Sequence, residues 1–254
     1  MTNDQLTALI TEQVRKALNG NTAFSATEKP VLNPTAPWYA DLAPVIEHSV
    51  LNPDMTEAKM KQACADAVTY GFANVCVTPY FVSAAADYLS GSKSVVSAPV
   101  GFPHAAASLV SKTAEIRYCI QCGAKELDLS LNIVAAKSGK WDDVYRDLCE
   151  MLNVAGNRAV CKAIYEQGLY TDEEKKRVLE IIERARAPYL KISNALTGKK
   201  AIPDDVRFVR SQIGNRIGIK IDGGIKTAAT VRDLMAAGAQ RFGASASVAI
   251  VTGK

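Results

Sequence analysis

From Trp38 onward the chain alternates short apolar segments of strand length with longer amphipathic segments of helix length. The predicted strands cover residues 45–48, 72–78, 94–100, 124–132, 159–166, 189–193, 217–222 and 240–244. The predicted helices cover residues 56–70, 81–89, 108–121, 141–152, 171–186, 203–213 and 227–237, and a last one begins near residue 247. Eight strand–helix units in about 210 residues are typical of an α/β protein with a (β/α)₈ fold, the TIM barrel.

A doubly wound open sheet would show the same alternation, so the side-chain pattern of the strands has to separate the two folds. Strands of an open sheet that is covered on both faces are apolar on both faces. In residues 126–132, one parity carries Glu126, Asp128, Ser130 and Asn132, and the other carries leucines. Because side chains alternate along a strand, this pattern favours a barrel, with leucines toward the outer helices and polar groups toward the interior.

The segment before the barrel is of a different kind. Residues 4–18 predict a short amphipathic helix, because Leu6, Ile10, Val14 and Leu18 recur every four residues. Residues 21–37 are polar, contain prolines and have no periodicity, which is typical of a linker. We therefore expect an N-terminal helix in residues 1–20, a linker in residues 21–37 and a barrel domain in residues 38–254.

Composition excludes several classes of protein. The net charge is only +4 and the basic residues are spread out, so nucleic acid is not an expected partner. No segment has the length of a membrane span, and the polar N-terminus shows no signal segment. The six cysteines suggest free thiols and a cytoplasmic protein. Cys119 and Cys122 have the spacing of a zinc half-site, but a chain with two histidines offers few further ligands, so we expect no metal and no cofactor.

Two lysines stand in the middle of apolar strands. Lys191 lies in residues 189–193 and Lys220 in residues 217–222, each at opposite parity to its apolar neighbours. Either lysine alone is compatible with an edge strand or with a side chain that reaches solvent. If both point into one enclosed space, each ammonium disfavours the charge on the other, and one amine is then available as a nucleophile toward carbonyls.

Asp128 and Lys162 lie at the same inward parity on the two preceding strands. Four charged groups in one barrel mouth are costly to desolvate unless they pair, so a set of structural ion pairs is the alternative interpretation. The functional interpretation is Schiff-base chemistry. One lysine attacks a substrate carbonyl, the second lowers the pKa of the first, and Asp128 transfers protons.

Glycine-rich turns follow the last three predicted strands. They contain Thr197, Gly198 and Lys199 after the sixth strand, Gly223, Gly224 and Lys226 after the seventh, and Gly243 and Ser245 at the end of the eighth. The loops after strands seven and eight form the usual phosphate site of TIM barrels. Glycine lets backbone N–H groups approach an anion closely. We therefore expect these residues to bind a phosphorylated substrate.

Residues 46–251 resemble the deoxyribose-phosphate aldolase family, whose members are class I aldolases with a barrel fold. The resemblance is carried by residues 48–56 (HSVLNPDMT), 75–79 (VCVTP), 100–103 (VGFP), 112–115, 123–128 (GAKELD) with Asn132, and 162–171. It implies that Lys191 forms the Schiff base, that Lys220 perturbs its pKa and that Asp128 transfers protons. It also places Lys162, Cys76 and Ser193 among the expected substrate contacts.

The reaction that the resemblance implies is the reversible cleavage of 2-deoxy-D-ribose 5-phosphate to D-glyceraldehyde 3-phosphate and acetaldehyde. Four features differ from the usual family pattern. The segment after Lys191 is longer, Asp222 stands where a small residue is common, and Lys226 stands where arginine is usual. The paired serines after the eighth strand are replaced by Ser245, Ala246 and Ser247. These differences leave open a related aldolase with another or an unphosphorylated aldehyde substrate.

The predicted N-terminal helix and linker resemble the encapsulation peptides that load enzymes into bacterial microcompartments. This resemblance implies a shell or scaffold protein as a partner of residues 4–18 and a location inside a microcompartment. A subunit-packing arm or an unstructured end is equally compatible with so generic an apolar stripe. A drifted barrel without activity, recruited to a scaffold, is a further alternative. We also expect a homo-oligomer.

Overall fold

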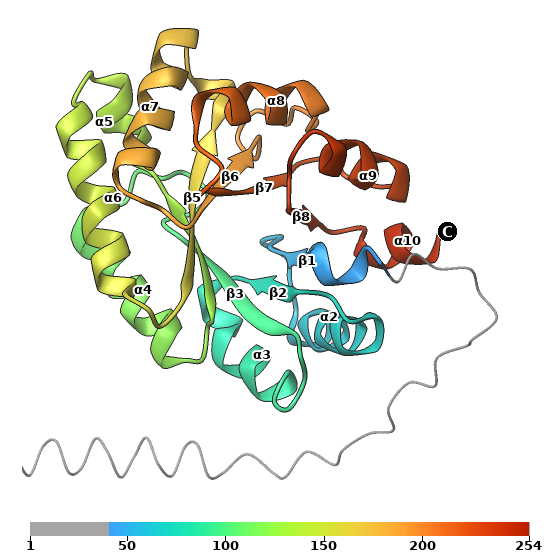
Figure 1. The fold of residues 1–254 in the computed structure, drawn as a ribbon. Helices are drawn as coiled ribbons and strands as arrows, with labels where there is room; N and C mark the ends of the chain where they lie inside the picture. Colours follow the sequence, from blue (N-terminus) through green and yellow to red (C-terminus); the bar gives the residue numbers. More distant parts are fainter. Residues whose placement is uncertain (1–40, 254) are drawn as a thin grey trace, which may run out of the picture. The chain divides into compact units, whose positions relative to one another are not determined.

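The computed structural model describes residues 41–253, so the predicted N-terminal helix and linker lie outside the described residues. Eight parallel strands form one closed barrel in the order of the sequence (Figure 1). The strands are β1 (Ile46–Val50), β2 (Asn74–Val77), β3 (Val95–Val100), β4 (Glu126–Ser130), β5 (Val160–Glu166), β6 (Tyr189–Ser193), β7 (Gly218–Asp222) and β8 (Arg241–Ala244). The predicted (β/α)₈ barrel is therefore confirmed.

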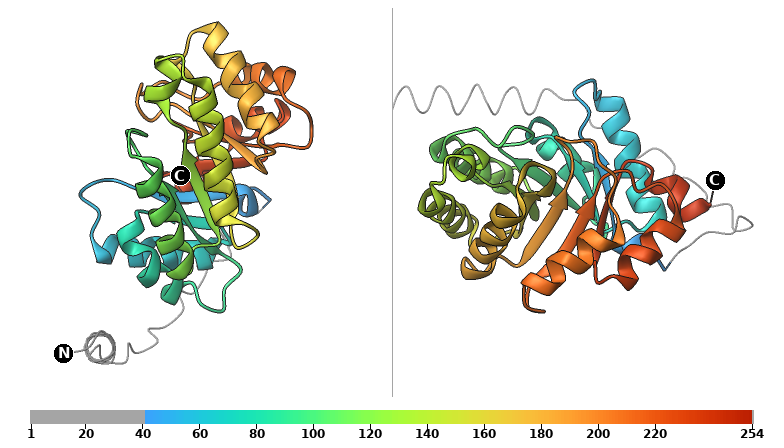
Figure 2. Two further views of the ribbon diagram at one scale, coloured as in Figure 1. Left: turned by 90° about the vertical axis from the view of Figure 1, so that its left-hand side faces the viewer. Right: turned by 90° about the horizontal axis from the view of Figure 1, so that it is seen from above.

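The helices lie outside the strands around the barrel, as two further views also show (Figure 2). They are α2 (Glu57–Tyr70), α3 (Val82–Tyr88), α4 (Leu109–Gln121), α5 (Ile133–Lys137), α6 (Trp141–Ala155), α7 (Asp172–Arg184), α8 (Pro203–Gln212), α9 (Ala228–Ala236) and α10 (Ser247–Thr252). The final helix, α10, returns to lie beside β1 and α2 (Figure 1). Within the described part of the chain, no helix is long and apolar enough to cross a membrane.

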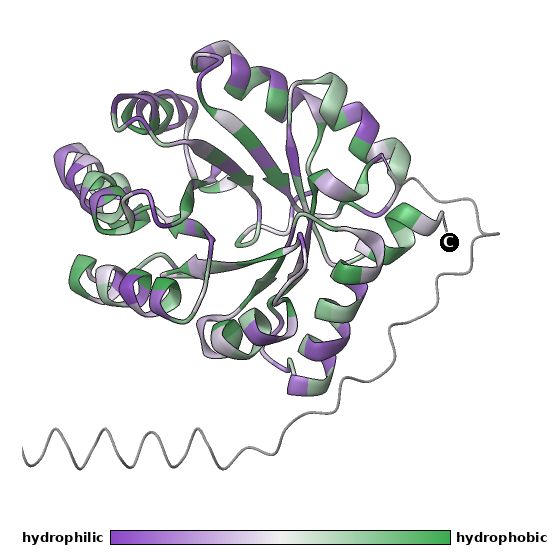
Figure 3. Ribbon diagram, turned by 60° about the horizontal axis from the view of Figure 1, so that its bottom comes forward, coloured by the Kyte–Doolittle hydropathy of each residue, from purple (hydrophilic) through white to green (hydrophobic). Residues whose placement is uncertain are grey.

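The core lies between the strands and the helices, because the strands alternate as predicted. Leu127 and Leu129 of β4 are fully buried on the outer side of the barrel, together with Leu148 and Met151 of α6. The helices carry hydrophobic and hydrophilic residues side by side, as expected for helices that cover a core with one face (Figure 3). The opposite parity of β4, which includes Asp128, is left for the barrel interior.

Local signals in the sequence account for several helix boundaries. Thr56 and Thr171 cap α2 and α7, each accepting a hydrogen bond from the backbone N–H three residues later. Pro203 occupies the first turn of α8, and Gly71 ends α2 in the left-handed conformation. These short-range interactions explain why most predicted elements begin and end within a few residues of their observed limits.

One α-helix was not predicted. The fourth strand ends at Ser130, and the short helix α5 follows it. Asn132 is not an inward-facing strand residue, because its side chain caps α5 by accepting a hydrogen bond from the backbone N–H of Ala135. Its amide nitrogen also donates to Asp147 of α6, at 2.9 Å. Asparagine readily makes such local hydrogen bonds, which compete with strand continuation.

Candidate active site

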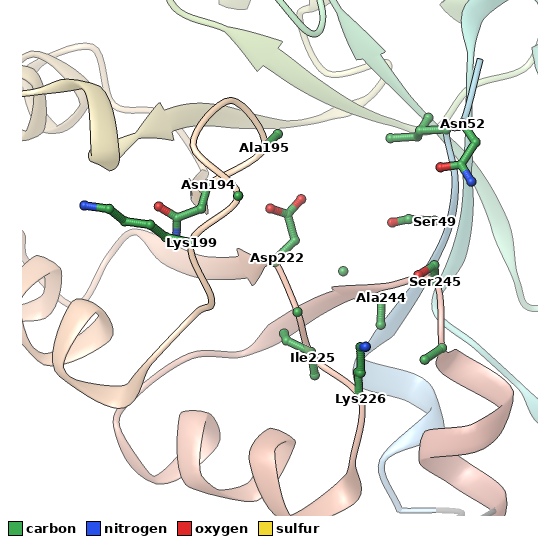
Figure 4. A pocket seen from close by; sticks show the side chains of 16 residues that line it. Ser49, Asn52, Asn194, Ala195, Lys199, Asp222, Ile225, Lys226, Ala244 and Ser245 are labelled. Carbon is green, nitrogen blue, oxygen red and sulfur yellow. The ribbon is translucent and has the colours of Figure 1, made fainter.

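A cavity of about 390 Å³ opens at the carboxyl ends of β1, β6, β7 and β8 (Figure 4). Ser49 and Asn52 line it from β1 and the following loop, and Asn194 from the segment after β6. Asp222 at the end of β7 points its carboxylate into the open space between these groups (Figure 4). The cavity is therefore at the end of the barrel where TIM-barrel enzymes carry their active sites.

Many of the predicted substrate-binding residues line this cavity. They are Gly198, Lys199, Gly223, Gly224, Lys226, Gly243 and Ser245. Gly223 and Gly224 both have positive φ, a conformation that glycine adopts without strain. The backbone N–H of Ala201 donates to the carbonyl of Gly223 at 3.0 Å, which ties the segment after β6 to the loop after β7.

Lys191 lies in β6, deeper in the barrel than the turns that line the cavity. Its side chain is almost completely buried, and its Nζ lies 3.0 Å from Oδ2 of Asp128 and 2.7 Å from Oδ2 of Asp222. The Phe102 ring is also near this ammonium, with 5.7 Å between Nζ and the ring centroid. Lys191 is not among the residues that line the cavity, but its partner Asp222 is, and Asp128 contacts the amine from the barrel interior.

Lys220 is the register partner of Lys191 on β7. Its Nζ donates to Asp128 and to Glu47, both at 2.6 Å. Oδ2 of Asp128 therefore accepts hydrogen bonds from both lysines. The predicted triad of Lys191, Lys220 and Asp128 is thus brought together in one contiguous cluster. Glu47 was not anticipated, because the predicted first strand carries a polar residue at each parity, Glu47 and His48.

The charges in this cluster hold each other in the ionised state. Burial alone would raise the pKa of Asp128, but the ammonium groups of Lys191, Lys220 and Lys162 hold it well below its usual range. Burial alone would lower the pKa of Lys191, but Asp128 and Asp222 raise it. Lys220 acts in the expected direction and lowers that pKa, yet the two carboxylates outweigh it. Together these neighbours favour the charged form of the Lys191 amine.

A deeper layer of charged residues lies next to the triad. The Nζ of Lys162 is completely buried and lies 2.5 Å from Glu126, 3.5 Å from Glu47 and 3.5 Å from Asp128. Arg241 of β8 contacts Glu47 at 3.0 Å and Glu126 at 2.6 Å. Lys162, predicted to contact substrate, is not among the residues that line the cavity. Its partners are the acidic groups of the barrel interior.

Cys76, Ser193 and Thr197, the remaining predicted contacts, do not line the cavity. Cys76 is completely buried in β2, where burial raises the pKa of its thiol to about 11. The Ser193 hydroxyl donates to Glu166 at 2.5 Å. The Thr197 side chain packs against Gly168. Among residues 41–253, no group of three or more His, Cys, Asp or Glu side chains could hold a metal ion.

Asn194 is a further residue that the sequence analysis did not single out. Its side chain is buried and lines the cavity (Figure 4). Neither its amide oxygen nor its amide nitrogen has a hydrogen-bond partner among the described residues. A buried amide without partners is costly, so a ligand in the cavity would be the natural partner. The resemblance did not reveal this role, because the chain differs from the family pattern at this segment.

Known proteins similar to this chain include several deoxyribose-phosphate aldolases. The chain is 40% identical over 213 residues to the deoxyribose-phosphate aldolase of Listeria monocytogenes, covering 84% of this chain and 96% of that protein. The solved structure of the aldolase QR15 is similar with a TM-score of 0.79 and 31% identity, covering 83% and 94% of the two chains. The deoxyribose phosphate aldolase of Aeropyrum pernix has a TM-score of 0.76 and 27% identity, covering 82% and 88%. No family model matches the chain.

Proposed function

Because the chain belongs to the deoxyribose-phosphate aldolase family, we propose that it reversibly cleaves 2-deoxy-D-ribose 5-phosphate through a Schiff base on Lys191. The products are D-glyceraldehyde 3-phosphate and acetaldehyde, and the enzyme is a lyase. The observation that carries the assignment of Lys191 is its position between a buried carboxylate, Asp128, and a cavity-lining carboxylate, Asp222.

In this reaction the amine of Lys191 adds to the carbonyl carbon of the substrate, and loss of water gives a protonated imine. The imine draws electrons from the neighbouring carbon–carbon bond, so cleavage releases the aldehyde acceptor and leaves an enamine. Protonation of the enamine and hydrolysis then release acetaldehyde. Asp128 holds the reacting nitrogen in place through a hydrogen bond, and Lys220 holds Asp128 in turn.

We place the phosphate group of the substrate in the same cavity. Gly223 and Gly224 line it with exposed backbone, and Lys199 and Lys226 also line it and add positive charge. Asp222 opposes an anion through Coulomb repulsion, although its ion pair with Lys191 offsets part of that effect. An unphosphorylated aldehyde acceptor is therefore the second candidate substrate, and Asp222 is the residue that favours it.

Comparing substrates tests the proposal. Turnover of 2-deoxyribose 5-phosphate is measured beside that of unphosphorylated 2-deoxyribose, and borohydride reduction during turnover is followed by peptide mass spectrometry. We expect a reduced adduct on Lys191 and a higher kcat/KM for the phosphorylated sugar. An adduct on another lysine, or none, contradicts the proposed nucleophile, whereas equal kcat/KM for the two sugars supports the second candidate substrate.

Two variants of the proposed nucleophile sharpen the test. Lys191→Ala is expected to abolish turnover, and Lys191→Arg keeps the positive charge between Asp128 and Asp222 without supplying a nucleophilic amine. Both are expected to lose the borohydride-trapped adduct. Lys175→Ala on α7 removes a lysine that pairs with Asp172 at the surface and is the matched control.

For the N-terminal segment we propose a targeting role. The support is the apolar stripe of residues 4–18 and the polar segment that follows it. Deleting residues 1–20 is expected to leave aldolase activity intact while removing the enzyme from the microcompartment fraction of cells. Loss of activity on deletion would instead favour a subunit-packing arm.

Self-association is a separate proposal. We infer a homo-oligomer, supported by Tyr80 and Val110, whose side chains are 82% and 78% exposed although they are large and apolar. Light scattering coupled to size-exclusion chromatography measures the mass of the particle in solution. A monomeric mass at micromolar concentration would contradict the inference.

A further inference from the structure

The two carboxylates that face Lys191 differ in their surroundings. Asp128 is completely buried, whereas the Asp222 side chain is 20% exposed and points into the cavity (Figure 4). Asp222 is the nearer of the two, at 2.7 Å from Nζ compared with 3.0 Å for Asp128. A substrate that enters the cavity therefore meets Lys191 on the side where Asp222 lies.

Asp128 forms ion pairs with three lysines at once. Its Oδ2 accepts hydrogen bonds from Lys191 and Lys220, and its Oδ1 lies 3.5 Å from Lys162. Three ammonium groups around one carboxylate oppose its protonation. Asp222, in contrast, pairs with Lys191 and with no other cation among residues 41–253. Of the two, Asp222 is thus the carboxylate that can take up a proton without losing several ion pairs.

The neighbouring strand leaves room for this side chain. Gly243 of β8 is the register partner of Asp222, and a Cβ built at Gly243 would lie only 2.8 Å from the Asp222 Cβ. A side chain at that position would push Asp222 away from its present position. The absence of a side chain at Gly243 therefore lets the Asp222 carboxylate lie beside the Lys191 amine.

We propose that Asp222 is the substrate-side proton carrier for formation and hydrolysis of the Lys191 imine. This inference rests on the proposed Schiff-base function and adds to it a catalytic residue outside the triad of Lys191, Lys220 and Asp128. Both carboxylates contact the reacting nitrogen, Asp222 from the cavity side and Asp128, the residue expected from the resemblance to transfer protons, from the barrel interior.

Lys191, Asp222 and the substrate account for every proton that moves in this reaction. The Lys191 ammonium passes one proton to the Asp222 carboxylate, which leaves a neutral amine and a carboxylic acid. The amine forms a bond to the carbonyl carbon, the C=O π bond breaks, and a proton moves from nitrogen to oxygen, which gives a neutral carbinolamine. Asp222 then returns its proton to the hydroxyl, water leaves, and the nitrogen lone pair forms the protonated imine.

The loss of N–H groups when the ammonium ion becomes an imine also explains why Asp222, rather than Asp128, loses its contact with the nitrogen. An ammonium ion has three N–H donors and can serve both carboxylates. The protonated imine has only one N–H, so it can keep a hydrogen bond to one of them. Asp128, which is held by Lys220 as well, is positioned to keep that bond, and Asp222 is then free to interact with water or substrate hydroxyls.

The test follows the rate of imine formation with acetaldehyde by rapid mixing, borohydride quenching and mass spectrometry of the Lys191 peptide. Asp222→Asn, which keeps size and shape, is expected to slow adduct formation about 10²-fold near neutral pH. Asp222→Ala is expected to be slowed similarly, and added formate is expected to restore part of its rate. Asp143→Asn on α6, which removes a surface carboxylate paired with Arg146, is the matched control.

The outcomes separate this inference from the proposed function. A counter-ion alone would hold Lys191 protonated, so its removal would speed adduct formation. An Asp222→Asn rate equal to or above that of the wild type therefore overturns the proton-carrier role, as does an Asp222→Ala rate that formate leaves unchanged. Absence of a Lys191 adduct in the wild type overturns the Schiff-base function itself, whatever the variants do.

Discussion

The chemistry of single residues in this barrel is set by how completely each charge is paired. Glu47 has three cationic neighbours, Lys220 at 2.6 Å, Arg241 at 3.0 Å and Lys162 at 3.5 Å. Burial alone would raise its pKa, but Lys220 and Lys162 lower it to about 2. Glu47 therefore anchors Lys220, and through Lys220 it anchors Asp128.

The depressed pKa of Glu47 predicts a pH dependence of stability. A carboxyl whose pKa is lower in the folded state stabilises the fold above its ordinary pKa of 4.5, and this contribution is lost as the pH falls toward about 2. Over that interval, we expect the free energy of unfolding to fall by about 3 kcal/mol more in the wild type than in Glu47→Gln. Urea titrations at several pH values measure the difference.

The variant also has an effect at neutral pH. Glu47→Gln leaves the buried Lys220 with one carboxylate fewer, so we expect a loss of about 3–5 kcal/mol at pH 7. Glu180→Gln, on the exposed surface of α7, is the matched control. A Glu47→Gln protein whose stability falls with acid as steeply as that of the wild type would contradict the assignment.

Asp222 also predicts a change in substrate preference. Replacing it by serine removes a negative charge from the cavity that is proposed to hold phosphate, so Coulomb repulsion falls by about 1.4 kcal/mol. We expect Asp222→Ser to lower KM for 2-deoxyribose 5-phosphate about tenfold, while the KM for unphosphorylated 2-deoxyribose stays constant. Because the proton carrier is lost, kcat is expected to fall for both sugars. Equal changes in the two KM values would show that charge repulsion is not the cause.

Among the elements, the loops at the carboxyl ends of β1, β6, β7 and β8 build the cavity. The loop after β5 does not line it and is fixed by the start of α7. Thr171 and Glu174 form a reciprocal capping box, and Glu174 also pairs with Lys137 of α5 at 2.7 Å. This arrangement fixes the end of the segment that leads from β5 into α7.

Removing the cap tests that role. Thr171→Ala takes away the side chain that accepts a hydrogen bond from the backbone N–H of Glu174, so we expect a loss of about 1 kcal/mol of stability. Thr171→Ser keeps a hydroxyl and is expected to retain most of it. Thermal unfolding by circular dichroism measures both variants. A Thr171→Ala protein as stable as the wild type would show that tertiary packing alone fixes the start of α7.

Across the whole barrel, eight charged side chains form one connected network of ion pairs. Its members are Glu47, Glu126, Asp128, Asp222, Lys162, Lys191, Lys220 and Arg241. Four are acidic and four are basic, so the network as a whole is balanced in charge. Such a network tolerates a reacting amine in its interior because every charge has a partner.

Lys162 tests how far this balance contributes to stability. Lys162→Met removes the cation that lies between Glu126, Glu47 and Asp128, so we expect a loss of about 3–5 kcal/mol in unfolding by denaturant. Lys175→Met on α7, where the ion pair is at the surface, is expected to cost less than about 1 kcal/mol. If Lys162→Met instead raises KM with little loss of stability, Lys162 contacts substrate rather than supporting the barrel.

Short-range patterns in the chain are sufficient to predict the barrel and the inward parity of Lys191, Lys220 and Asp128. Strand periodicity, helix caps and glycine turns depend on neighbours a few residues away, so they can be read from the sequence. The glycine turns that line the cavity were predictable for the same reason. The helix α5 was missed because the side-chain cap of Asn132 competes locally with strand continuation.

Which charged side chains form ion pairs with each other could not be predicted from such short-range patterns. Glu47 lies 173 residues from Lys220 and 194 from Arg241, and it meets them because β1 pairs with β8 when the barrel closes. The contact of Asp222 with Lys191 likewise depends on the rotamers of two side chains on neighbouring strands. The sequence alone identified Asp222 only as a charge that opposes phosphate. Pairing of β6 with β7 made it a partner of Lys191, because their register places the two side chains within reach of each other.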